Sequence, residues 1–141
     1  MLPRTETEID EFLLQFESCT LAKEQWTHSA HVLTGACYVH SMGEREATDK
    51  MRACVQRYNV AVGGENTETS GYHETITVAW MKLLARLLCE LQPIGRAEFA
   101  QAAISQFGSN RRILESYYDF DVVNSTEARM RWIPPTLAPL D

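Results

Sequence analysis

Apolar residues recur along much of this chain at the three- and four-residue spacing of amphipathic helices. Ile9, Phe12, Leu13 and Phe16 fall at i, i+3, i+4 and i+7, and acidic residues precede them. That pattern predicts a helix over residues 6–17, and similar patterns predict helices over 26–40, 44–58, 72–91, 97–107 and 109–118, with a short turn from 124. No strand pattern of useful length occurs. We therefore expect an all-α fold, a compact bundle of five to seven helices in one domain of residues 1–141.

Residues suited to cap helix N-termini precede three of the expected helices. Thr27 suits the second helix, and the segment from Ser41 to Glu44 has the spacing of a capping box for the third. Thr69 or Ser70 is expected to cap the fourth helix.

Two segments lack a helical pattern. Residues 59–71 contain Gly63-Gly64 and a polar run, and loops of this length in small domains are often functional. The segment from Trp132 to Leu140 is rich in proline, which predicts an extended C-terminal tail across the bundle, anchored by Trp132 and Leu137.

Charge and composition exclude several classes of function. The formal net charge is -6 and the basic residues are dispersed, so nucleic acid is not an expected partner. Residues 25–42 carry no charged side chain, but their histidines would be costly in hydrocarbon, so we expect a buried central helix and no membrane partner. Four scattered cysteines, and an N-terminus without a basic and then apolar segment, predict a cytoplasmic protein with reduced thiols.

Three histidines at predicted helix starts form the best candidate site. His28 and His31 lie at i and i+3 of the second helix, and His73 lies in the first turn of the fourth. Helix dipoles disfavour imidazolium there, so neutral rings are available as ligands or bases. Three imidazoles around an open position are typical of a catalytic divalent metal ion (zinc, nickel, iron or manganese), with Glu74 or Glu17 as a further ligand or base.

The leading functional prediction is a small metal-dependent enzyme, with hydrolysis as one reaction it could perform and Glu74 as the general base. One alternative is a non-catalytic protein that binds a small molecule in a polar, histidine-lined pocket. Another is a structural or partner-binding module in which the histidines form a closed hydrogen-bond network. No HExxH motif or Glu-x-x-His pair supports the metal, so enzymatic activity is left open. The expected partner is a small-molecule ligand or substrate, and a homodimer is also left open.

Other side chains near these helix starts are candidates for binding a substrate. Four aromatic residues could line a pocket, although aromatic residues at helical spacing are usually core: Trp26, Tyr72, Trp80 and Tyr117. Four arginines could hold an anionic substrate, although most surface arginines are only solvated: Arg52, Arg57, Arg111 and Arg112. Arg52 and Asn59 are kept as candidates because they lie near the loop that leads to His73.

Several strings resemble those of a family of uncharacterised bacterial proteins, and together they span most of the chain. They are Phe16-Glu17, Trp26-Thr-His-Ser-Ala-His31, Arg57-Tyr-Asn59, Gly71-Tyr-His-Glu-Thr-Ile-Thr77, Ala128-Arg129 and the Trp- and Pro-rich tail from Trp132 to Leu140. In that family a Tyr-Tyr-Ser string stands where this chain has Tyr117-Tyr-Asp119, and an Asp stands at the position of Thr136. The resemblance implies no activity, but its motifs contain His28, His31, His73 and Glu74.

Overall fold

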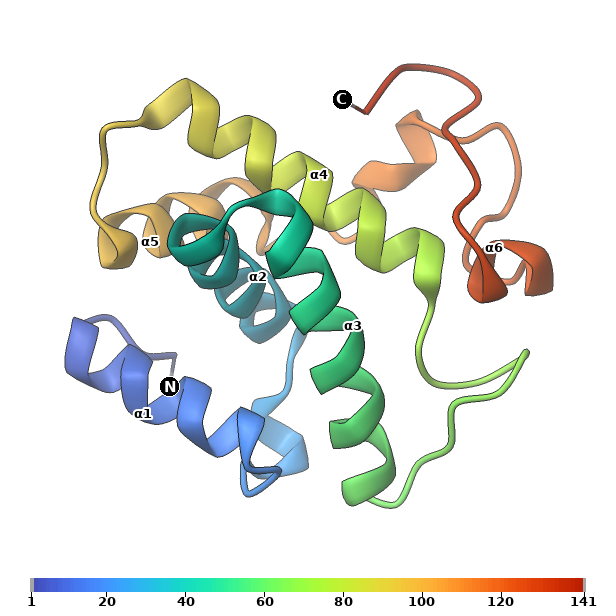
Figure 1. The fold of residues 1–141 in the computed structure, drawn as a ribbon. Coiled ribbons are helices and arrows are strands. Elements are labelled where there is room, and N and C mark those ends of the chain that lie inside the picture. The colour runs from blue at the N-terminus through green and yellow to red at the C-terminus, as the bar shows by residue number, and fades with distance from the viewer. Residues whose placement is uncertain (1, 141) are drawn as a thin grey trace.

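Six α-helices and two short 3-10 helices make up the computed structural model, which describes residues 2–140 (Figure 1). They are α1 (Glu6–Glu17), η1 (Lys23–Gln25), α2 (His28–Met42), α3 (Glu44–Ala61), α4 (Glu74–Leu91), α5 (Arg96–Phe107), η2 (Ile113–Ser116) and α6 (Thr126–Met130). Residues 2–140 contain no strand, so the expected all-α bundle is confirmed.

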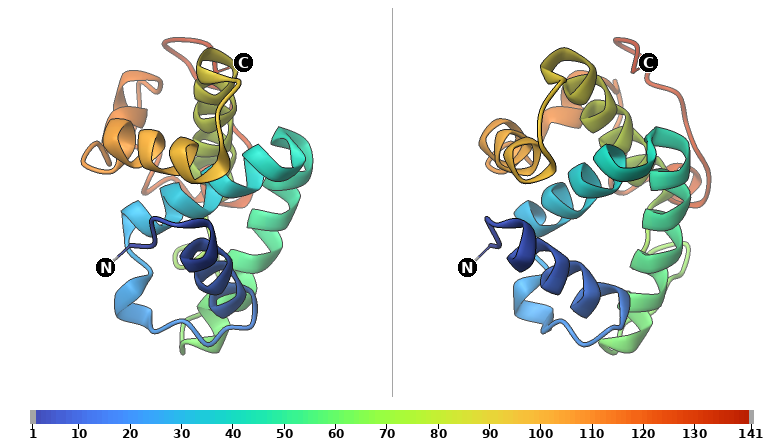
Figure 2. Two further views of the ribbon diagram at one scale, coloured as in Figure 1. Left: turned by 90° about the vertical axis from the view of Figure 1, so that its left-hand side faces the viewer. Right: turned by 60° about the vertical axis from the view of Figure 1, so that its left-hand side comes forward.

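Helix α2 is the centre of the bundle. It packs against α3, α4 and α5, and in both views of Figure 2 α1 lies on one side of it with α4 and α5 on the other. Every residue from Val32 to Val39 is buried, as the uncharged sequence predicted. Gly35 permits a close approach to α4, because a Cβ at this position would lie 2.8 Å from Leu84 Cδ1 and 3.1 Å from Met81 Sδ.

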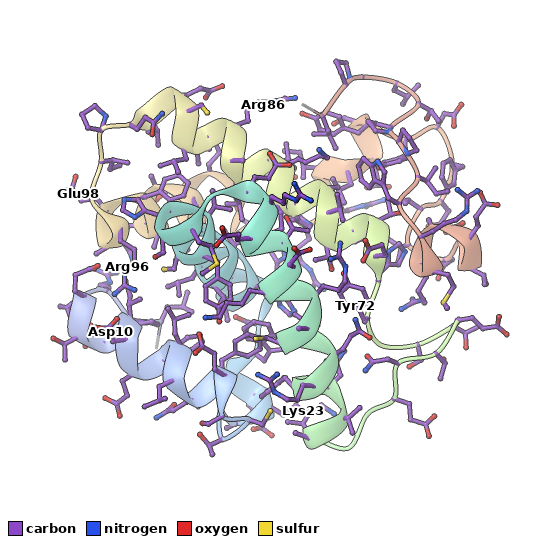
Figure 3. The ribbon with its side chains drawn as sticks, in the orientation of Figure 1. Asp10, Lys23, Tyr72, Arg86, Arg96 and Glu98 are labelled. Carbon is purple, nitrogen blue, oxygen red and sulfur yellow. The ribbon has the colours of Figure 1, made fainter. Side chains whose placement is uncertain are left out.

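Helix α1 begins and ends where its pattern predicted. Thr5 and Glu8 form a capping box, and the predicted apolar stripe is buried. Arg96 of α5 donates to Glu6 at 2.9 Å and to Asp10 at 2.6 Å, which ties α1 to α5; Figure 3 labels Asp10 and Arg96. At the other end of α1 the ring of Phe16 stacks on Trp26, which lies between η1 and α2.

The predicted caps of the third and fourth helices are wrong. Ser41 lies inside α2, and Gly43, whose φ is +85°, separates α2 from α3 without any side-chain cap. Helix α4 begins at Glu74 rather than near residue 72, and His73 caps it in place of Thr69 or Ser70. The imidazole Nδ1 accepts the Ile76 N–H at 3.1 Å, as a carboxylate or hydroxyl oxygen does in commoner caps.

The C-terminal part differs most from the prediction. Between residues 109 and 118 only the 3-10 turn η2 forms, and α6 follows with Ser125 as its N-cap. Leu137 is 58% exposed, so it does not anchor the last segment; Leu140 is buried instead. The N–H groups of Thr136 and Leu137 both donate to the Tyr117 carbonyl, which fixes this segment beside η2. None of the helices described for residues 2–140 is long and apolar enough to span a membrane.

Candidate functional site

The starts of α2 and α4 border a cavity of about 720 Å³, which we call the histidine cavity. Its walls come mainly from α2, α3, α4 and the loop of residues 62–73 between α3 and α4, and η1, residues 26–27 and Arg111 complete them. Apolar and aromatic side chains form most of the wall: Trp26, Val32, Met51, Val55, Val62, Tyr72, Ile76, Trp80, Met81 and Leu84. The polar side chains on it are Lys23, Thr27, His28, His31, Asn59, Glu65, Ser70, His73, Thr77 and Arg111. This size and composition are typical of sites for small organic ligands.

His31 presents a neutral ring to the histidine cavity. Its Nδ1 lies 3.0 Å from the Thr27 carbonyl oxygen, which can only accept, so Nδ1 carries the hydrogen and donates. Burial, with the nearby His28 and the positive charge of Arg111, lowers the pKa of His31 to about 4. The Nε2 lone pair is therefore a hydrogen-bond acceptor at pH 7, and Nε2 makes no hydrogen bond to the described residues.

An aromatic stack holds the His31 ring in place. The imidazole centroid lies 4.0 Å from the Trp26 ring, and Trp26 stacks on Phe16 of α1 at 4.2 Å with an interplanar angle of 16°. Tyr58 of α3 contacts both Phe16 and Trp26, and its hydroxyl donates to the Leu21 carbonyl at 2.7 Å. The ring orientation thus follows from packing among α1, η1 and α3.

His28 has the opposite tautomer to His31. Its Nε2 donates to the Phe107 carbonyl at the end of α5, 3.1 Å away, which leaves the Nδ1 lone pair free. Burial lowers the pKa of His28, and the charge of Arg111 lowers it further. The edge of the ring meets Trp80 at a centroid distance of 5.1 Å. The cavity wall therefore holds two imidazoles that each keep one acceptor.

His73 has no nitrogen left for a ligand. Its Nδ1 accepts the Ile76 N–H, and its Nε2 donates to the Val122 carbonyl at 2.9 Å. Burial lowers the pKa of this ring, which is 8% exposed. His73 borders the cavity, but its hydrogen bonds cap α4 and attach the segment before α6 to it.

This bonding pattern bears on the predicted metal site. A metal ion would have to displace the Val122 or Ile76 hydrogen bond before His73 could coordinate it. Residues 2–140 contain no group of three His, Cys, Asp or Glu side chains placed to hold a metal ion. The divalent metal ion, whether zinc, nickel, iron or manganese, stays a prediction.

Glu74 lies in an ion-pair network outside the cavity wall. Arg52 donates from Nε and Nη2 to its two carboxylate oxygens at 2.9 and 2.8 Å, and the Tyr72 hydroxyl donates to it at 2.7 Å. Arg52 lowers the pKa of Glu74 more than burial raises it. Both oxygens of this carboxylate are engaged, so the network fixes Tyr72 against the cavity and gives no support to Glu74 as a general base.

Asn66 shapes the loop over the cavity. Its Oδ1 accepts from Asn59 Nδ2 and from the Tyr72 N–H, each at 3.0 Å, and its Nδ2 donates to the Gln56 carbonyl at 2.9 Å. One amide side chain therefore ties the middle of the loop and its C-terminal end to α3.

A second clamp holds the end of the loop. Arg129 of α6 donates to the Gly71 carbonyl at 2.7 Å. Gly71 has a φ of +78°, and a Cβ there would lie 2.2 Å from the Glu65 carbonyl oxygen. Only glycine fits this position without moving the loop.

The structure brings most of the sequence candidates together. Eight candidates line the histidine cavity: Trp26, His28, His31, Asn59, Tyr72, His73, Trp80 and Arg111. Six others do not: Glu17, Arg52, Arg57, Glu74, Arg112 and Tyr117. Glu17 accepts hydrogen bonds from Tyr38 at 2.7 Å and lies 3.2 Å from Lys50, between α1 and α3. Lys23 and Asn66 were missing from the sequence candidates; the polar loop before Gly71 was the available signal for Asn66.

Comparisons with protein-family models, with curated proteins and with solved structures found no match to this chain. The resemblance to an uncharacterised bacterial family therefore stays an expectation.

Proposed function

We propose that this chain binds a small organic molecule in the histidine cavity. The observation that carries the proposal is the pair of fixed, neutral imidazoles on an otherwise mainly apolar wall. His31 keeps a free Nε2 acceptor and His28 a free Nδ1 acceptor, because carbonyl oxygens occupy their other nitrogens. The ligand expected here has an apolar body that carries at least one N–H or O–H group.

This arrangement favours binding over the metal-dependent enzyme predicted from the sequence. The predicted enzyme assigned the base to Glu74 and an ion to the three histidines, but Arg52 and Tyr72 occupy Glu74 and backbone groups occupy His73. His31 is a weak base because burial depresses its pKa to about 4. Its neutral ring suits recognition, in which an acceptor of fixed direction selects a donor on the ligand.

A fluorescent probe that is apolar and carries one N–H, N-phenyl-1-naphthylamine, tests the proposal. Val62 is partly buried and lines the cavity, whereas Val60, two residues earlier on α3, is 61% exposed and does not line it. We expect Val62→Trp to fill the cavity and weaken probe binding by about tenfold or more, and Val60→Trp to change it less than about twofold. Equal affinities for both variants would contradict the proposal.

The hydrogen bond from the ligand N–H to His31 has its own test. His31→Gln keeps an acceptor oxygen on the cavity wall, whereas His31→Leu removes it. We expect His31→Leu to weaken probe binding by about three- to tenfold and His31→Gln to recover part of that loss, because one hydrogen bond contributes about 0.5–1.5 kcal/mol. An unchanged affinity in His31→Leu would exclude this imidazole as the acceptor.

A further inference from the structure

The mouth of the histidine cavity carries two basic side chains without protein partners. Most Lys and Arg residues of the chain are held by carboxylates or carbonyl oxygens, as Arg52, Lys82 and Arg96 are. Lys23 of η1 and Arg111, which precedes η2, make no ion pair or side-chain hydrogen bond within residues 2–140. Both are exposed and both line the cavity; Lys23 is labelled in Figure 3.

The charge at this mouth is positive although the whole chain is acidic. Glu65 is the one acidic side chain among the lining residues, against Lys23 and Arg111. Arg111 lies close enough to His28 and His31 to lower the pKa of each ring. A protein with a formal net charge of -6 thus exposes two cations without ion-pair partners in the described part of the chain, beside the histidine cavity.

The two cations at the cavity mouth point to one ligand chemistry. Lys23 and Arg111 are donors without acceptors among the described residues, and both line the cavity. An anionic group on the ligand would supply the acceptor that these two side chains lack.

We infer that the ligand is an amphipathic organic anion, with a carboxylate, sulfonate or phosphate at the cavity mouth beside Lys23 and Arg111. This inference rests on the proposed function and adds the charge of the ligand to it. The apolar body lies against Ile76 and Trp80, and its N–H or O–H group meets the free nitrogens of His28 and His31. Charge-assisted hydrogen bonds are stronger than neutral ones, so Lys23 and Arg111 at the mouth favour ligands that carry an anionic group over neutral ones.

Two probes that differ by one sulfonate group separate this inference from the proposed function. 8-Anilinonaphthalene-1-sulfonate has the rings and the N–H of N-phenyl-1-naphthylamine and adds a sulfonate. We expect the double variant Lys23→Gln/Arg111→Gln to weaken binding of the sulfonate probe by about tenfold or more and to change the neutral probe less than about twofold. Arg112→Gln is the matched control, because Arg112 is adjacent in sequence, pairs with Glu115 and lies outside the cavity wall.

The results with the two probes distinguish failure of this inference from failure of the proposed function. If the neutral probe responds to Val62→Trp but the double variant leaves the sulfonate probe unchanged, or affects both probes equally, the inference is overturned and the proposed function stands. If neither probe responds to Val62→Trp, both are overturned. Loss of the sulfonate probe in Arg112→Gln to the same extent as in the double variant would also overturn the inference, because it would show a general effect of surface charge.

Discussion

Replacement of His73 by alanine would remove three stabilising features at once. The Ile76 N–H would lose its cap, which costs about 1 kcal/mol, and the buried Val122 carbonyl would lose its donor, which costs about another 1 kcal/mol. The ring is 8% exposed, and the space it leaves adds a further cost of about 1 kcal/mol. We therefore expect His73→Ala to lower the free energy of unfolding by about 3 kcal/mol.

The matched variant His73→Asn separates these contributions. Asn is among the best N-cap residues, so it keeps the bond to Ile76 but is too short to reach Val122, and we expect a loss of about 1.5 kcal/mol. Urea denaturation of both variants, after treatment with a chelator, measures the two values without any contribution from metal. A loss below about 0.5 kcal/mol in His73→Ala would refute the structural role given to this histidine.

Three further predictions follow from the same contacts. Gly71→Ala should destabilise the fold by about 2 kcal/mol or more in urea denaturation and abolish probe binding. Gly63→Ala is the control: Gly63 has a φ of +94°, but no atom lies within 4 Å of a Cβ there, so the loss should be only about 1 kcal/mol. Burial places the folded-state pKa of His31 near 4, below the ordinary histidine value of 6.5, so the unfolded chain takes up the proton first. Stability should therefore be full above pH 6.5 and fall by about 1–2 kcal/mol by pH 5, and it should fall less in His31→Gln. A pH-independent urea midpoint would show that this ring is not buried as described. Element analysis of protein without a histidine tag should find less than roughly a tenth of an ion per chain, and zinc, nickel, iron or manganese should cause no thermal shift. About one ion per chain in this protein, and none in His73→Asn, would instead support the metal-dependent enzyme predicted from the sequence.

The helices with strong apolar periodicity could be predicted from the sequence because burial alone determines them. Helix α1 was predicted to the residue, and the uncharged run of α2 correctly indicated the central helix. Helix ends were less predictable, since they depend on single hydrogen bonds. His73 caps α4 with an imidazole, a residue type seldom considered for that role, so the start of α4 was predicted two residues too early.

The candidate site was partly predictable for the same reason. Helix starts placed His28, His31 and His73 at one end of the bundle, and all three line one cavity. Which nitrogen of each ring is free depends on the carbonyls of Thr27, Phe107 and Val122, and two of these three carbonyls lie far away in sequence. No pattern in one sequence reports such contacts, so the sequence could suggest a shared ion where the structure shows separately bonded rings.

The chain contains its own control for the central claim, that a small organic molecule binds in the histidine cavity. Trp26 and Trp80 line this cavity, whereas Trp132 lies elsewhere, beside Lys82 and the prolines of the last segment. A ¹H–¹⁵N NMR titration of the full chain with N-phenyl-1-naphthylamine follows the three indole N–H signals together. We expect the signals of Trp26 and Trp80 to shift in proportion to occupancy while that of Trp132 stays in place. Shifts confined to Trp132, or no saturable shift of any indole signal, would contradict this claim.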